Sequence, residues 1–150
     1  MIKKKTKYNE VVDQIEAEIV AKEPVVCPLK HYFTPGLYSR EIFIPAGTIL
    51  TSKIHKTEHP YVVSLGKVAV IKEDDGVEII EAPHFGITMP GTRRVLHTIT
   101  DVIWTTFHPT AIMPKSGLEE DVLKAVDAIE AVIIEPYTNE LISNKKEELT

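Results

Sequence analysis

The histidines are the leading candidates in this chain for residues that do chemistry. His55 and His59 stand four positions apart, a spacing at which two imidazoles can hold one metal ion, and His97 or His108 could supply a third. His97 follows Arg94 by three residues, so on a regular strand these two side chains face opposite sides and cannot both point inward without a bulge. A divalent metal ion on His55, His59 and His97 is therefore one hypothesis for this chain.

The histidines lie in a region that reads as short strands, between about residues 32 and 110. β-branched and aromatic runs alternate there with turn residues, and Asp75-Gly76 predicts a hairpin because glycine accepts the positive φ of a type I′ turn. Regularly spaced strands without helices between them predict a sandwich or barrel. The predicted strands cover residues 41–45, 48–55, 61–64, 67–72, 77–81, 85–88, 94–98 and 102–107, and the other predicted corners are Gly47, Gly66, Gly86 and Gly91.

Two amphipathic helices are predicted to flank the strands. The first covers residues 9–22, with Asn9 as its N-cap and Pro24 beyond its end. The second begins at Ser116, whose spacing to Glu119 fits a capping box, and ends before Pro136. Its predicted apolar stripe consists of Leu118, Val122, Ala125, Val126, Ile129 and Val132 or Ile133.

Composition bounds the class of protein. The 150 residues suffice for one domain, and the hydrophobic share of 43% with a charged share of 26% excludes a wholly disordered chain. The net charge of −5 and the absence of aromatic residues interleaved with Arg93-Arg94 argue against nucleic-acid binding. The single Cys27 excludes an intramolecular disulfide and a cysteine-rich metal site. No apolar run is long enough for a membrane span, so we expect a cytoplasmic protein.

Residues 47–66 resemble the first sequence motif of the cupin family. Gly47 and Gly66 match the two glycines of that motif, and His55 matches its second histidine. Lys53 stands where the motif has its first histidine, and His59 stands where it has a glutamate.

Residues 86–94 resemble the second cupin motif. Gly86 and Gly91 match its glycines, Met89 replaces its proline, and Arg94 takes the place of its histidine. The resemblance extends over about residues 38–110. It implies a small jelly-roll β-barrel. Together with the helical patterns on either side, this divides the chain into an N-terminal helical arm in residues 1–30, a cupin-like barrel in residues 31–110, and a C-terminal helix and tail in residues 111–150.

In a cupin the residues at these positions converge on a metal ion inside the barrel, so the resemblance implies that Lys53 and Arg94 face the interior. Two permanent cations there would repel a divalent cation and favour an anion, because like charges about 4 Å apart at an effective dielectric near 20 cost roughly 4 kcal/mol. The alternative is that both lie at the rim, paired with Glu58 or Asp101. The candidate ligand-binding residues are Lys53, His55, His59, Tyr61, Thr92, Arg93 and Arg94.

Three functions remain open from the sequence. The first is a non-enzymatic protein that binds or sequesters a small anionic molecule, such as a nucleotide, without a cofactor. The stretches at residues 40–47, 90–94 and 104–110 resemble small cupin-like proteins of tailed bacteriophages, which places this function in the host cytoplasm. The second is a structural or assembly module of the virion, and the third is a metal-dependent cupin enzyme. Because cupins often associate through sheet faces and terminal arms, the resemblance also implies a homo-oligomer.

Overall fold

The computed structural model describes residues 7–20, 25–72 and 76–136. The predicted all-β core with one helix before it and one after it is confirmed. The predicted turn at residue 75 and most of the predicted C-terminal tail lie outside the described residues. The elements are α1 (Lys7–Val20), β1 (Leu29–Thr34), β2 (Leu37–Ile44), β3 (Ile49–Thr51), β4 (His59–Leu65), β5 (Lys67–Lys72), β6 (Gly76–Glu81), β7 (His84–Thr88), β8 (Val95–Thr98), β9 (Val102–Pro109) and α2 (Glu119–Ile133).

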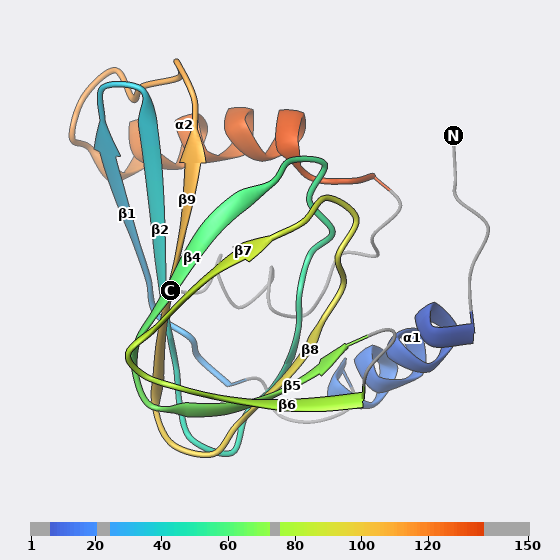
Figure 1. Ribbon diagram of the computed structural model, residues 1–150. Coiled ribbons are helices and arrows are strands. Elements are labelled where there is room, and N and C mark those ends of the chain that lie inside the picture. Colours follow the sequence, from blue (N-terminus) through green and yellow to red (C-terminus); the bar gives the residue numbers. More distant parts are fainter. Residues whose placement is uncertain (1–6, 21–24, 73–75, 137–150) are drawn as a thin grey trace.

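The strands form two antiparallel sheets that face each other across the core (Figure 1). One sheet has the order β1-β2-β9-β4-β7 and the other the order β3-β8-β5-β6. Strands far apart in the chain are therefore neighbours in space, as where β9 lies between β2 and β4. Two packed sheets with long-range pairing of this kind make a small cupin-like jelly-roll barrel, as the sequence predicted.

All eight predicted runs coincide with strands, but two differences matter for the site. β1, which was not predicted, extends the five-stranded sheet at one edge. β3 ends at Thr51 and does not continue to His55. Beyond it the chain turns to the end of α2, where the amide of Lys56 donates to the carbonyl of Ile133 at 2.7 Å. His55 is therefore held by a contact with α2 rather than by a regular strand.

The barrel core is built from side chains at alternating strand positions, as period-2 burial requires. Its fully buried members come from both sheets, so one continuous apolar cluster joins them. Tyr61 and Trp104 stack at the centre with ring centroids 4.6 Å apart. The most completely excluded aliphatic residues are Ile44, Val63, Val68, Val70 and Val102.

Two glycines show that close approach, and not only turn geometry, selects this residue. Gly66 has a φ of +92°, and a Cβ there would meet the carbonyl oxygen of Asp101. Gly86 was predicted to be a corner, but it lies within β7, opposite Tyr61. A Cβ at Gly86 would lie 2.5 Å from the Tyr61 ring, so this glycine makes room for the aromatic core.

α2 covers one end of the five-stranded sheet, across the ends of β1, β2 and β9 (Figure 1). Val126, Ile129 and Ile133 pack against Tyr38 of β2. The predicted capping box is wrong: the N-cap is Leu118, and the Ser116 hydroxyl accepts from the Leu118 amide at 3.1 Å, so it holds the turn before the helix. Leu118 itself is 69% exposed and does not belong to the packed stripe.

α1 lies beside the four-stranded sheet, near β3 (Figure 1). Val12 of this helix is buried, and Tyr8 donates from its hydroxyl to the carbonyl of Arg93 at 2.7 Å. Both helices thus pack on the barrel of their own chain. Within the described residues, neither helix is long and apolar enough to cross a membrane.

Candidate functional site

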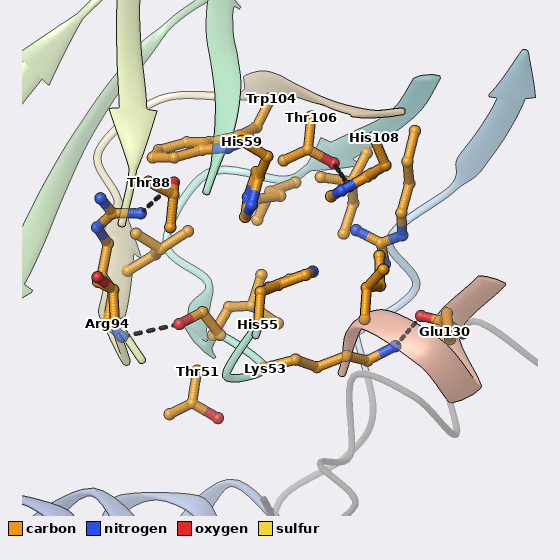
Figure 2. Close-up of a pocket in the computed structure, with 18 of the residues that line it drawn as sticks. Thr51, Lys53, His55, His59, Thr88, Arg94, Trp104, Thr106, His108 and Glu130 are labelled. Atoms are coloured by element: carbon orange, nitrogen blue, oxygen red, sulfur yellow. Dashed lines mark hydrogen bonds and ion pairs between the residues drawn. The ribbon is translucent and has the colours of Figure 1, made fainter. Parts of the chain in front are cut away.

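A cavity of about 110 Å³ opens between the two sheets and is covered at one end by α2. Its apolar wall comes mainly from β2, β8 and β9 and includes Trp104. Its polar groups come from the loop after β3, from β4 and from α2, among others (Figure 2). A water molecule needs roughly 10–15 Å³ of such space, so the cavity has room for several waters or a small ligand. The ionisable residues that line it are Tyr38, Arg40, Lys53, His55, His59, Arg94, His108 and Glu130.

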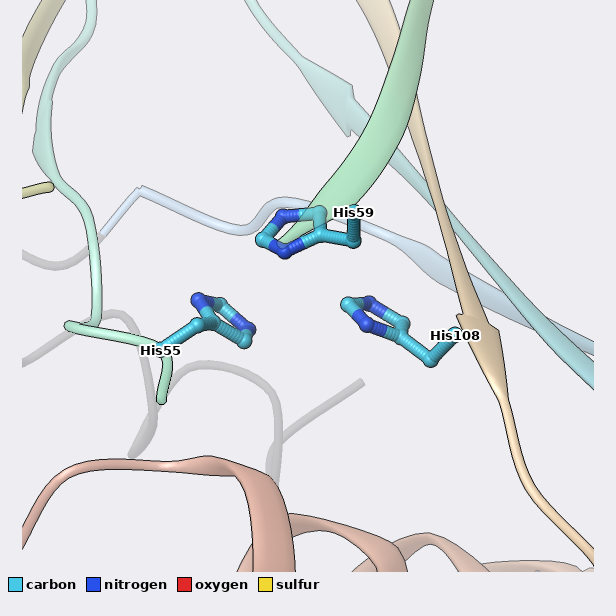
Figure 3. Close-up of side chains that lie close together, drawn as sticks. All are labelled: His55, His59 and His108. Atoms are coloured by element: carbon cyan, nitrogen blue, oxygen red, sulfur yellow. The ribbon is translucent and has the colours of Figure 1, made fainter. Parts of the chain in front are cut away.

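Three histidines meet on one side of this cavity. His55 comes from the loop after β3, His59 from the first position of β4, and His108 from the end of β9, and their rings point toward one another (Figure 3). The ring centroids lie 4.5 Å apart for His55 and His59, 4.7 Å for His59 and His108, and 5.3 Å for His55 and His108. One nitrogen from each ring lies within 4.8 Å of the other two. The fold thus brings together donor atoms from three separate segments.

Hydrogen bonds orient two of the three rings. Nδ1 of His59 donates to the carbonyl oxygen of Thr57 at 3.2 Å, which leaves Nε2 of His59 as the unprotonated nitrogen. Nε2 of His108 lies 2.9 Å from the hydroxyl of Thr106 (Figure 2). Nδ1 of His108 is buried and has no hydrogen-bond partner among the described residues.

Burial sets the charge of the cluster. Burial, with a smaller contribution from the neighbouring histidines, lowers the pKa of His55 to about 3. Burial likewise lowers the pKa of His108 to about 3 and lowers the pKa of His59. The three rings are therefore neutral at pH 7, which is the form that accepts a metal ion or donates a neutral hydrogen bond.

Permanent cations line the rest of the cavity. Lys53 forms an ion pair with Glu130 of α2, with Nζ 2.7 Å from Oε2 (Figure 2). Arg94 donates from Nη1 to the hydroxyl of Thr88 at 2.9 Å, and its guanidinium lies 5.4 Å from the centroid of the Tyr61 ring. Burial lowers the pKa of Arg94, but a guanidinium stays charged at neutral pH. Arg40 is the third cation in the lining.

Five of the seven predicted ligand-binding residues line this cavity: Lys53, His55, His59, Thr92 and Arg94. Tyr61 lies behind the wall, where it stacks on Trp104 and supports Arg94. The alternative paired Lys53 and Arg94 with Glu58 or Asp101. The structure shows an ion pair of Lys53 with Glu130 of α2 and a hydrogen bond of Arg94 to Thr88, while Asp101 accepts the amide of Ala46 at 2.9 Å.

Arg93 requires a correction, because it points away from the cavity. Successive residues of an extended chain face opposite sides, so Arg93 cannot share the environment of Arg94. Its guanidinium is instead buried against α1, where Nη2 pairs with Asp13 at 2.8 Å and with Glu16 at 2.5 Å. Arg93 thus joins α1 to the barrel and is not available to a ligand in the cavity.

His97 also requires a correction. It is an exposed residue of β8, paired between Ile49 and Ala69, and it is not part of the histidine cluster. The third histidine is His108, which the sequence left open as an alternative. The signal for it was the alternation of Val102, Trp104, Thr106 and His108 along one face of β9.

Arg40, Tyr38 and Glu130 were missed by the sequence reasoning. Arg40 and Tyr38 belong to the first half of β2, which the predicted strand over residues 41–45 did not include. Glu130 reaches the cavity only because α2 packs across the barrel end. No local pattern in the sequence indicates that a residue 77 positions after Lys53 becomes its partner.

No protein-family model and no curated protein matches this sequence. Similar solved structures include cupin-2 domain-containing proteins from Shewanella frigidimarina (8% identity over 65% of this chain and 98% of that chain, TM-score 0.47) and from Halorhodospira halophila (16% identity over 74% and 83%, TM-score 0.49). Another is an RmlC-like cupin family protein with a double-stranded β-helix fold from Methanocaldococcus jannaschii (8% identity over 60% and 85%, TM-score 0.48). The strand order of the two sheets, rather than these alignments, defines the fold.

Proposed function

We propose that this protein binds a small anionic molecule inside its barrel. The observation that carries the proposal is the charge of the cavity lining: Arg40, Lys53 and Arg94 are cations, and Glu130 is the one carboxylate among the described residues that line it. The neutral histidines add no negative charge. An anion that enters such a cavity is attracted by the cations of its lining, which outnumber the carboxylate.

The lining offers both attraction and geometry to such a ligand. Arg94 is placed by Thr88 and by the Tyr61 ring, so its planar guanidinium is presented to the cavity in one orientation. A guanidinium held in this way binds carboxylate or phosphate oxygens through two parallel hydrogen bonds. The hydroxyl of Thr92, which lines the cavity, donates to the carbonyl of Met89 at 2.7 Å, so it can only accept from a ligand. The imidazole of His55 can donate one further hydrogen bond. The volume fits a small carboxylate or phosphate, or the anionic head group of a nucleotide.

The role we infer is binding rather than catalysis, in a protein of phage type. The support for this is the resemblance described above, together with the replacement of two metal-ligand positions of the cupin motifs by Lys53 and Arg94. Sequestration of a metabolite requires only affinity, which a charged cavity in a rigid barrel supplies. Turnover of a bound ligand in the presence of a metal ion would instead favour the metal-dependent enzyme.

Calorimetric titration of the full chain tests the proposal. The ligands are inorganic phosphate, a small dicarboxylate and a nucleoside monophosphate, each in buffer with a metal chelator. Lys53→Ala and Arg94→Ala should each weaken binding at least tenfold, because each removes a cation that contacts the anion. Removal of Lys53 also leaves Glu130 without this partner, as a negative charge facing the ligand. Lys124→Ala is the matched control, since this lysine is 70% exposed on α2.

Two results would contradict the proposal. One is the absence of binding for all three ligands. The other is an equal effect of the cavity variants and the control, which would mean that binding depends on net charge and not on this cavity. Circular dichroism of each variant excludes loss of the fold as the cause.

A further inference from the structure

We propose that His55, His59 and His108 bind one divalent transition-metal ion of the zinc, cobalt or nickel type, and that an anionic molecule completes its coordination. The metal site stands on the histidine cluster alone. The anion that completes the coordination rests on the proposed function, because it is the same anion that the cations of the cavity attract.

The spacing of the donor atoms fits such an ion. Three imidazole nitrogens lie within 4.8 Å of one another. Around a tetrahedral zinc ion with Zn–N bonds of about 2.0–2.1 Å, ligand nitrogens lie about 3.3 Å apart. Side-chain rotations that bring the most distant pair closer by about 1.5 Å would therefore close the site. The rings already point toward one another (Figure 3), so no strand has to move.

The outer hydrogen bonds of the cluster are those of metal-binding histidines. A ligating imidazole usually donates its second N–H to a carbonyl or other oxygen, which fixes the nitrogen that faces the metal. His59 does this through the carbonyl of Thr57, and His108 has the hydroxyl of Thr106 beside its Nε2.

Nδ1 of His108 gives a second reason to expect a metal ion at this place. It is buried without a hydrogen-bond partner among the described residues, in a side chain that is only 3% exposed. A buried polar atom without a hydrogen-bond partner destabilises the folded state, so native structures rarely keep one without a reason. A metal ion bound at this nitrogen removes the cost.

The charge of the site explains why an anion belongs to it. The three ligands are neutral, and the nearest carboxylate of the lining, Glu130, is held by Lys53 at 2.7 Å. A bound divalent ion therefore receives no compensating charge from its ligands, and its charge adds to that of Arg94. An anionic ligand on the open side of the metal offsets this charge, and the guanidinium of Arg94 can hold its far end.

These ligands are not the set that the motif resemblance implies. Lys53 and Arg94 occupy two of its ligand positions, His59 occupies its glutamate position, and His108 belongs to neither motif. Imidazole ligands suit zinc, copper, iron and nickel, and Cys27 is excluded as a further ligand because it is buried in the apolar core.

Cobalt titration of the untagged, chelator-stripped full chain tests the metal site. We expect one Co²⁺ per chain with visible absorption bands of a four-coordinate site, and one Zn²⁺ per chain by elemental analysis. His55→Ala and His108→Ala should each weaken metal binding at least a hundredfold. Thr106→Val, which removes only the outer hydrogen bond, should weaken it about 10–100-fold. His97→Ala, an exposed histidine outside the cluster, should change nothing.

The outcomes separate this inference from the proposed function. Absence of stoichiometric metal, or an equal effect of His97→Ala and His108→Ala in folded protein, overturns the metal site whatever the anion titrations show. If His108→Ala fails to fold, the half-buried His55→Ala decides the matter. Phosphate added to the cobalt-loaded chain should shift the absorption bands in the wild type but less in Arg94→Ala. Unchanged bands in the wild type would overturn the anion as completing ligand and leave anion binding under chelator as a separate result.

Discussion

Arg93 and Arg94 are neighbours in the chain, yet their surroundings differ in every respect. Arg93 is buried against α1, and two carboxylates, Asp13 and Glu16, neutralise it. Arg94 faces the cavity, where its neighbours are a hydroxyl and an aromatic ring. The Arg93 contact joins α1 to the barrel, whereas Arg94 presents its positive charge to the cavity. The Arg93 contact stabilises the packing of α1 on the barrel, and Arg94 stands where the proposed anion binding requires a cation.

The largest expected effect concerns Arg93. Arg93→Met leaves Glu16 buried without its partner, so we expect the free energy of unfolding to fall by about 3–5 kcal/mol. Arg94→Met should cost about 1 kcal/mol or less, since it removes one hydrogen bond and also relieves a desolvated charge. Urea denaturation of both variants measures the two losses. Adding Glu16→Leu to Arg93→Met should restore part of the stability, and equal losses for the two arginine variants would contradict the comparison.

Acid should destabilise the fold through the histidines of the cavity. His55 and His108 have pKa values of about 3 in the folded protein and about 6.5 when unfolded. The unfolded state therefore binds more protons between these values, and the stability that neutral rings provide is lost as the pH falls below 6.5. From pH 7 to pH 5 the two histidines together should account for about 4 kcal/mol of lost stability.

Denaturation at both pH values, in the presence of a chelator, checks this number. The double variant His55→Gln and His108→Gln should lose about 4 kcal/mol less than the wild type over this range. His97→Gln, which changes an exposed ring, should behave as the wild type does. A double variant with the full acid sensitivity of the wild type would show that the cluster is not its source.

A smaller loss of stability is expected from overpacking at the Tyr61 ring, which supports Arg94. Gly86→Ala places a Cβ 2.5 Å from the Tyr61 ring, and overpacking of this kind costs about 1–3 kcal/mol. Because Tyr61 supports Arg94, the variant should also weaken binding of an anion. Thermal denaturation measures the first effect and calorimetry the second. Gly117→Ala, whose added Cβ meets no atom within 4 Å, is the control and should leave both unchanged.

The parts of the site that could be predicted are those that depend on local spacing. His55 and His59 are close in sequence, so their joint position in the lining followed from the motif. Arg93 was wrongly placed beside Arg94, although alternation along an extended segment separates adjacent residues. His97 was named as the third ligand with His108 as the alternative, but the face of a strand and its neighbours decide which residues meet.

The sequence by itself determined eight of the nine described strands and the two helices, because period-2 and helical patterns and turn residues are local properties of the chain. The class of barrel followed from the resemblance to the cupin motifs. Only the tertiary structure decided which side chains share the cavity. Lys53 contacts Glu130, which lies 77 residues further along the chain, and His55 contacts His108, which lies 53 residues further along. Such contacts arise from sheet order and from the packing of α2 on the barrel end, which depend on the burial of apolar surface by the whole chain.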